Sequence, residues 1–163
     1  MGIGGDSTVT LDIMKSLLSM QQYVLLKHYG GTTDVRNIQQ KINKEYKNYT
    51  GIIPCDGLYG REMNKALVQV LQAIEGFSPS QATGNFGNGT KSRLKEIYDS
   101  NANSNPRWYW LLKACLICNN IEVTDSVSNS IKEFQKIYGL PINGKADINT
   151  WMSLMISKGN PDR

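Results

Sequence analysis

The chain has 163 residues, of which 40% are hydrophobic and 20% are charged. This composition excludes an intrinsically disordered chain, and the length suits one ordinary domain or two small ones. The formal net charge of +4 suits an anionic partner, but the lysines and arginines are too scattered for strong nucleic-acid binding. No apolar run is long enough to cross a membrane, so we expect no membrane insertion.

Apolar residues at helical spacing predict three helices in the first part of the chain. The first runs from Thr10 to about Leu26, and the third runs from Arg61 to about Glu75. The second begins after a cap formed by Thr33 or Asp34, and its apolar face extends to Tyr46. We expect Gly76 to stop the third helix and Gly139 to stop a later one.

A short helix and a linker follow in the middle of the chain. Thr90 is expected to open the helix, whose apolar residues continue through Tyr98. Residues 99–105 are the most linker-like segment, so we place a module boundary there. Asn105 and Pro106 then begin the next helix as a cap and a proline at the first helical position.

Two further helices complete the chain. One follows a cap at Asp125 or Ser126, and the last runs from Trp151 to Lys158 after a cap at Asn149 or Thr150. No segment alternates between apolar and polar residues over the length of a strand. The sequence therefore predicts an all-α fold.

A six-residue pattern recurs where helices begin. We expect its glycines to adopt positive φ, and we expect Thr90 and Thr150 to cap the helices that follow. Gly84 and Gly144 lie 60 residues apart (144 − 84), which fits a repeating bundle of three helices rather than a solenoid. The copies are Gly2, Gly5 and Thr8; Gly57, Gly60 and Met63; Gly84, Gly87 and Thr90; and Gly144, Asp147 and Thr150.

Other chemistry for the glycines and cysteines is poorly supported. A phosphate-binding loop needs a Gly-Lys-Ser/Thr sequence and a preceding strand, and neither is present. Cys115 and Cys118 form a Cys-x-x-Cys motif, but it lies in a helical pattern, and His28 is the single histidine. We predict core thiols, a buried Cys55, no disulfide framework, no metal and no other cofactor.

The repeat and its helices resemble the bacterial peptidoglycan-binding domain, a three-helix module that binds the cell wall. The first matching stretch is Ile38-Gln39-Gln40, Asp56-Gly57-Leu58-Tyr59-Gly60, Ala66-Leu67, Leu71-Gln72, Gly76-Phe77 and residues 84–90. The second is residues 130–135, Gly139-Leu140, Asn143-Gly144 and residues 150–154.

The resemblance implies a tandem organisation. Residues 34–100 would form a first module and residues 105–158 a second, while residues 1–30 would be the remnant of a preceding copy. The second module is partly degenerate, because residues 121–124 replace its first Asp-Gly and Asp147 replaces a glycine.

The two ends of the chain suggest a larger protein. Residues 1–5 lack the basic region and apolar core of a signal peptide and fall inside a copy of the repeat, so we expect the natural protein to be longer there. Residues 150–163 resemble the junction that precedes a glycoside-hydrolase-like domain in some Gram-positive wall proteins. This resemblance implies the binding portion of a secreted or wall-associated protein, which we expect to be monomeric.

The resemblance implies a region that binds peptidoglycan through its glycan or its stem peptide. Aromatic rings could stack on sugars, and an arginine could pair with stem-peptide carboxylates. We expect Tyr59, Arg61 and Asn88 to be exposed and Trp151 to belong to the core. The candidate ligand-binding residues are Asp56, Tyr59, Arg61, Phe86, Asn88, Asn143 and Trp151.

Two alternatives remain open from the sequence. A wall hydrolase would need two carboxylates across a cleft, and Asp56, Glu62 and Glu75 are available, although no motif brings them together. A protein-interaction or pro-region role would also suit a helical bundle. We predict a binding region rather than an enzyme.

Overall fold

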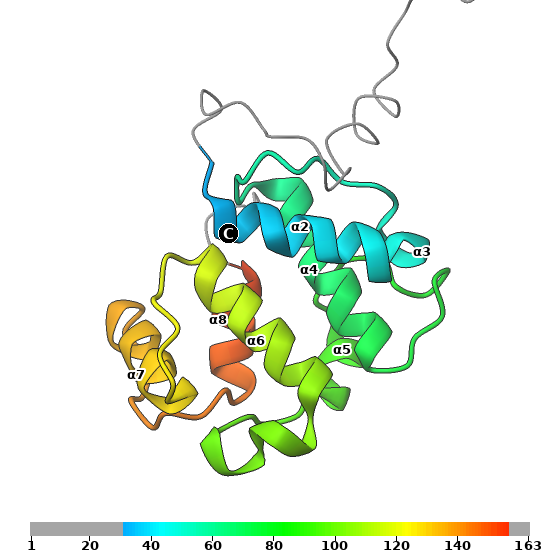
Figure 1. Cartoon of the computed structure of the whole chain (residues 1–163). Helices are drawn as coiled ribbons and strands as arrows, with labels where there is room; N and C mark the ends of the chain where they lie inside the picture. Colours follow the sequence, from blue (N-terminus) through cyan, green and yellow to red (C-terminus); the bar gives the residue numbers. More distant parts are fainter. Residues whose placement is uncertain (1–30, 157–163) are drawn as a thin grey trace, which may run out of the picture.

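The computed structural model describes residues 31–156, and these residues form an all-α structure, which confirms the predicted fold class. The predicted helix at residues 10–26 and the end of the predicted last helix lie outside the described residues. Figure 1 shows the helices in chain order: α2 (Thr33–Glu45), α3 (Lys47–Thr50), α4 (Arg61–Ile74), α5 (Asn88–Arg93), the 3-10 helix η2 (Asp99–Ser104), α6 (Pro106–Cys118), α7 (Val127–Ile137) and α8 (Ile148–Ile156).

Helix α6 joins the two halves of the chain into one core. It packs against α2 and α4 of the first half and against α7 and α8 of the second (Figure 1). Leu111, Leu112 and Leu116 are fully buried, and one apolar cluster extends from Val35 to Met155. A helix that is apolar on several faces must be covered on several faces. Burial of each leucine contributes about 1.5–3 kcal/mol to the free energy of unfolding. Because α6 packs on helices of both halves, it is the main link between them.

Local signals fix most helix ends where the sequence places them. Ser126 caps α7 as predicted, accepting a backbone N–H bond of 3.4 Å. The predicted cap of α2 at Thr33 or Asp34 is wrong, because both residues lie inside the helix and Thr32 caps it with a bond of 3.3 Å. Pro106 is the first residue of α6. Gly76 and Gly139 follow α4 and α7 with φ of 85° and 67°, as their predicted role of stopping these helices requires.

The predicted capping by Thr90 and Thr150 is wrong. Thr90 and Thr150 are buried within their helices, since α5 starts at Asn88 and α8 at Ile148. The alternative cap Asn149 also lies inside α8. Asp147 caps α8 instead, because its carboxylate accepts the Thr150 backbone N–H at 2.9 Å. Burial raises the pKa of Asp147, but hydrogen bonds from Thr150, Asn143 and the backbone outweigh this effect and hold the pKa below its ordinary value.

The segment between the halves is structured rather than a free linker. Helix α5 ends at Arg93, so the predicted continuation through Tyr98 is wrong. Ile97 instead forms an antiparallel bridge with Ala146, with backbone hydrogen bonds of 3.4 and 2.8 Å. Asp99, the first residue of η2, accepts hydrogen bonds from Ser126 and Ser128 at the start of α7. These contacts tie the segment to the second half.

The three cysteines are free and buried, which confirms that the Cys-x-x-Cys motif lies in the core. Burial raises the pKa of Cys118 to about 12 and that of Cys55 to about 11. It also raises the pKa of Cys115, whose sulfur lies 4.0 Å from that of Met155. These thiols are therefore protonated and unreactive at neutral pH.

Candidate functional site

Three glycine loops are held by the same device. In each, a glutamine on an earlier helix is buried, and its side-chain oxygen accepts the backbone N–H of the first glycine. The carboxamide therefore replaces a backbone partner that the sharp turn removes. The pairs are Gln39 with Gly57 at 2.8 Å, Gln72 with Gly84 at 2.9 Å, and Gln135 with Gly144 at 3.0 Å.

The amide nitrogen of each glutamine completes the device. It donates to the carbonyl of the residue after the glycine, namely Leu58 at 3.2 Å, Asn85 at 3.0 Å and Lys145 at 3.0 Å. In the second and third loops it also donates to the hydroxyl of Thr90 or Thr150, at 3.1 and 3.0 Å. In the first loop Met63 takes the place of the threonine, and the amide donates to Asp56 at 2.9 Å.

The two glycines of the pattern differ in the first and second loops, while the third loop has Asp147 in the second position. Gly57 has φ of +76°, and a Cβ there would lie 2.5 Å from the Thr32 carbonyl oxygen. Gly60 and Gly87 have extended backbones with open space around them, and each precedes a helix. The predicted positive φ is therefore confirmed for the first glycine of each described loop and wrong for the second. The copy at Gly2 lies outside the described residues.

Sequence reasoning missed the glutamines. All three belong to stretches that carry the family resemblance, but their role depends on partners 8 to 19 residues away. The available signal was a glutamine on one of the helices that precede each glycine loop. Such a polar residue on a buried helix face needs a hydrogen-bond partner, and the glycine loop is the nearest source.

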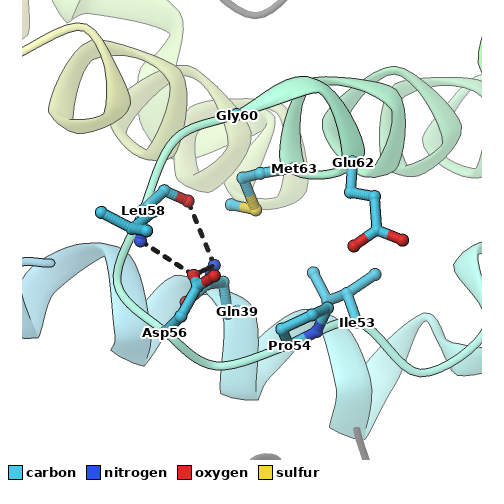
Figure 2. Close-up of a pocket in the computed structure, with 8 residues that line it drawn as sticks. All are labelled: Gln39, Ile53, Pro54, Asp56, Leu58, Gly60, Glu62 and Met63. Atoms are coloured by element: carbon cyan, nitrogen blue, oxygen red, sulfur yellow. Dashed lines mark hydrogen bonds between the residues drawn. The ribbon is translucent and has the colours of Figure 1, made fainter. Parts of the chain in front are cut away.

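The first loop borders a small pocket of about 60 Å³. Figure 2 shows Asp56 and Leu58 on one side and Glu62 on the other, with Met63 between them. Pockets that enclose drug-sized ligands span about 300–1,000 Å³, so this one suits a methyl group or a water rather than a sugar ring. Although Asp56 and Glu62 flank it, the pocket is too small to pass a glycosidic bond between two catalytic carboxylates.

Three predicted site residues belong to this first loop. Asp56 is half-buried, and its Oδ1 also accepts the Leu58 N–H at 2.9 Å. The Tyr59 hydroxyl donates to the Leu154 carbonyl at 3.3 Å and accepts from Asn64 at 2.7 Å. Tyr59 is therefore half-buried against α8 rather than exposed, because its hydroxyl has partners inside the fold. Arg61 is exposed, as expected.

The other predicted residues lie on separate loops. Phe86 is half-buried against the core, and Asn88, the first residue of α5, is exposed as expected. Asn143 is exposed, and its side chain bonds both to Gln135 and to Asp147, which gives it a structural role in the third loop.

Trp151 lies in the core, as expected. It is completely buried, its ring packs edge-on against Trp108 at 5.9 Å, and its indole N–H donates to the Lys95 carbonyl at 3.0 Å. A fully buried indole offers no face to a ligand, so Trp151 supports the loops from within rather than contacting a partner.

Glu75 is the carboxylate with the most unusual setting. Both of its side-chain oxygens are covered and lack a hydrogen-bond partner among the described residues. Burial raises its pKa to about 8, although the nearby Arg93 lowers it in part. Glu75 does not line the pocket beside Asp56 and Glu62, so the three acids do not form one site.

No metal site or membrane span appears in the part of the chain that the structure describes. Within residues 31–156, no group of three His, Cys, Asp or Glu side chains is placed to hold a metal ion. None of the described helices is long and apolar enough to cross a membrane.

Comparisons with known proteins place these loops in a family. A model of the FadG/YbfG, PGDB-like domain matches residues 28–155 and so covers both halves of the fold. The chain is 38% identical over 167 residues to the uncharacterized protein YbfG of Bacillus subtilis (strain 168), covering 97% of this chain and 22% of YbfG. It is also 38% identical over 166 residues to the uncharacterized protein FadG of the same organism, covering 97% of this chain and 28% of FadG.

The chain thus spans less than a third of the length of either relative. No solved structure matches it. The family model and the all-α fold together give a peptidoglycan-binding-like domain. The chain belongs to the FadG/YbfG PGDB-like domain family.

Proposed function

We propose that the chain binds bacterial peptidoglycan without cleaving it, and that it holds a longer, secreted or wall-associated protein at the cell wall. The observation that carries the proposal is the match of a PGDB-like family model to residues 28–155. The net charge of +4 adds a favourable interaction with an anionic wall. The greater length of YbfG and FadG supports a role as one part of a larger protein.

We also propose that the halves of the fold are tandem copies of one module. The glutamine-held glycine loop supports this, because it occurs twice in the first half and once in the second with the same donors and acceptors. Such a device fixes the glycines from inside. The residues between them are then free to differ and to contact the wall.

The first loop is the proposed contact surface. Leu58 is 46% exposed and lies beside the small pocket, and Arg61 presents its guanidinium to solvent. A methyl of an acetyl group or of a D-alanine residue would fit a pocket of about 60 Å³. A stem-peptide carboxylate could pair with Arg61.

Gly60 provides a clean test, because it lines the pocket and has open space where a side chain would project. Gly60→Trp should cover the pocket and weaken retention on insoluble peptidoglycan about tenfold, a loss of about 1.4 kcal/mol. Gly87→Trp is the matched control, since Gly87 has the same extended backbone and position before a helix but lies on the second loop. It should leave retention unchanged.

The measurement is a pull-down with purified walls, accompanied by the turbidity of a wall suspension. The wild-type chain should be enriched over a wall-free control, and the turbidity should stay constant. Loss of turbidity would contradict a purely binding role. No enrichment of the wild-type chain would favour a protein-interaction or pro-region role instead.

A further inference from the structure

A groove of about 570 Å³ lies at the junction of the two halves, and one of its lining residues, Thr32, donates a backbone hydrogen bond to Gly57 of the first glycine loop. Its lining residues belong to the start of α2, the last turns of α6 and the connection that follows α6. Its volume falls within the range typical of pockets that bind small ligands, which the first-loop pocket does not reach. The lining residues include an apolar set, which consists of Ile117, Ile121 and Val123.

The charged residues around this apolar set are of both signs. Lys113 contributes an ammonium, while Asp34 and Glu122 contribute carboxylates. None of the three forms an ion pair with another described residue; the Lys113 ammonium lies 5.3 Å from the ring centre of Tyr109. A ligand with charges of both signs could therefore pair with groups that the fold leaves unpaired.

Asn120 adds an amide to the groove at an unusual backbone position. It has φ of 60° and is the one described residue other than glycine with positive φ. It ends α6 as Gly76 and Gly139 end α4 and α7, because in each case the next residue donates its N–H five residues back. Asparagine tolerates this conformation less well than glycine. Of these three helix ends, only the one at the groove therefore carries a side chain.

We propose that this groove binds a short peptide that bears both a free carboxylate and an ammonium group, and that its natural occupant is the stem peptide of peptidoglycan. Lys113 would pair with the carboxylate, Asp34 and Glu122 with the ammonium, and Asn120 would bond the peptide backbone. The isoleucine and valine side chains would contact the methyl groups of alanine residues. The inference rests on the proposed wall binding, but it assigns the peptide to a surface that needs both halves of the fold.

The test uses the full chain and a fluorescent stem tripeptide, L-alanyl-γ-D-glutamyl-L-lysine, whose binding is followed by fluorescence anisotropy. Saturable binding should weaken as salt increases. Lys113→Gln should weaken it about tenfold, as expected for the loss of a hydrogen bond to a charged group. Lys136→Gln is the matched control, because it removes the same charge from α7, outside the groove. It should change binding less than twofold.

Asn120→Gly separates binding from folding. Glycine suits φ of 60° at least as well as asparagine, so thermal stability should not fall. Binding of the tripeptide should still weaken, about threefold. Unchanged binding by Asn120→Gly, or equal effects of Lys113→Gln and Lys136→Gln, would overturn the proposal.

Modified peptides identify which charges of the peptide the groove recognises. Acetylation of the lysine side chain should weaken binding to the wild-type chain about tenfold. It should have little effect on a chain that carries both Asp34→Asn and Glu122→Gln, because the partners of the ammonium are then absent. An equal loss in both chains would contradict the assignment of the carboxylates.

Three further outcomes separate the competing occupants. A chain that is retained on walls but does not bind the tripeptide would overturn the groove assignment and leave wall binding intact. A chain that fails both assays would overturn both proposals. Concentration-dependent dimerisation that Lys113→Glu abolishes would assign the groove to a second copy of the chain and overturn the peptide proposal.

Discussion

The connections on either side of α7 are held by the same helix in different ways. The α7–α8 connection contains Gly144 and is held by Gln135, whose carboxamide bonds to both sides of the turn. The α6–α7 connection has no glycine and is held by Ser130. The Ser130 hydroxyl donates to the Glu122 carbonyl at 2.9 Å and accepts the Thr124 N–H at 3.1 Å.

The two supports differ because the two side chains differ in length and in the number of hydrogen bonds that they can form. A carboxamide carries two donors and an oxygen acceptor, so it can satisfy several groups of a loop that folds back sharply. A hydroxyl on a short side chain satisfies two groups of a segment that passes close to the helix. The missing Asp-Gly at residues 121–124 is therefore replaced by a different support, and this segment forms one wall of the groove beside α6.

The largest expected effect comes from removing the carboxamide. Gln135→Leu keeps the volume but leaves the N–H groups of Asn143 and Gly144 and the hydroxyl of Thr150 without partners. The free energy of unfolding should fall by about 3–4 kcal/mol, measured by urea denaturation. Ser130→Ala should cost only about 1–2 kcal/mol, because fewer bonds are lost. Equal losses would show that the two supports do not differ as argued.

The second largest effect is the difference in stability loss between substitutions at the two glycines of the first loop. Gly57→Ala places a methyl against the Thr32 carbonyl at positive φ, so we expect a loss of about 2–3 kcal/mol. Gly60→Ala meets open space with an extended backbone and should change stability by less than about 0.5 kcal/mol. Thermal unfolding of both variants measures the contrast. Similar melting temperatures would contradict the distinct roles of the two glycines.

A smaller effect is the pH dependence of stability that we expect from the end of α4 and not from the end of α7. Glu75 ends α4 and has a pKa raised to about 8, whereas Tyr138 occupies the same place after α7. Because the folded state holds the proton more tightly than the unfolded state, Glu75 supports stability fully below about pH 4.5, and this support is lost as the pH rises toward 8. Because Glu75 is only partly buried, we expect an effect of about 1 kcal/mol.

Glu75→Gln should remove this pH dependence and raise the free energy of unfolding at pH 8 above that of the wild type. Chemical denaturation of both chains at pH 4.5, 6 and 8 measures the free energy of unfolding at each pH. Tyr138→Phe is the control and should leave the slope unchanged over this range, because it removes no carboxylate. A wild-type chain with the same stability at all three values would contradict the raised pKa.

The sequence predicted what depends on neighbours along the chain. Gly76 and Gly139 stop helices through their own backbone conformation, and Cys115 and Cys118 follow the apolar period of α6. Two of the departures involve distant partners. The path of Ile97 is set by Ala146, and the burial of Tyr59 is set by a carbonyl 95 residues away. A periodic pattern carries no information about such pairings.

The candidate site was predicted in outline only. The glycine loops were found from their spacing, and Arg61 and Asn88 are exposed as expected. Tyr59 and Trp151 illustrate why residue type alone did not identify the surface. An aromatic residue beside a glycine loop can stack on a ligand or fill the core, and only the packing of α8 decides between the two.

The contacts of α4 with the end of α8 bear on how the chain folds. Tyr59 and Asn64 donate hydrogen bonds to the carbonyls of Leu154 and Met155, which are synthesised 95 and 91 residues later. Helical bundles usually fold quickly because their contacts are local, but these contacts close a loop of 95 residues. The first half should therefore acquire its final structure only after α8 has arrived, as the last step in folding of the domain.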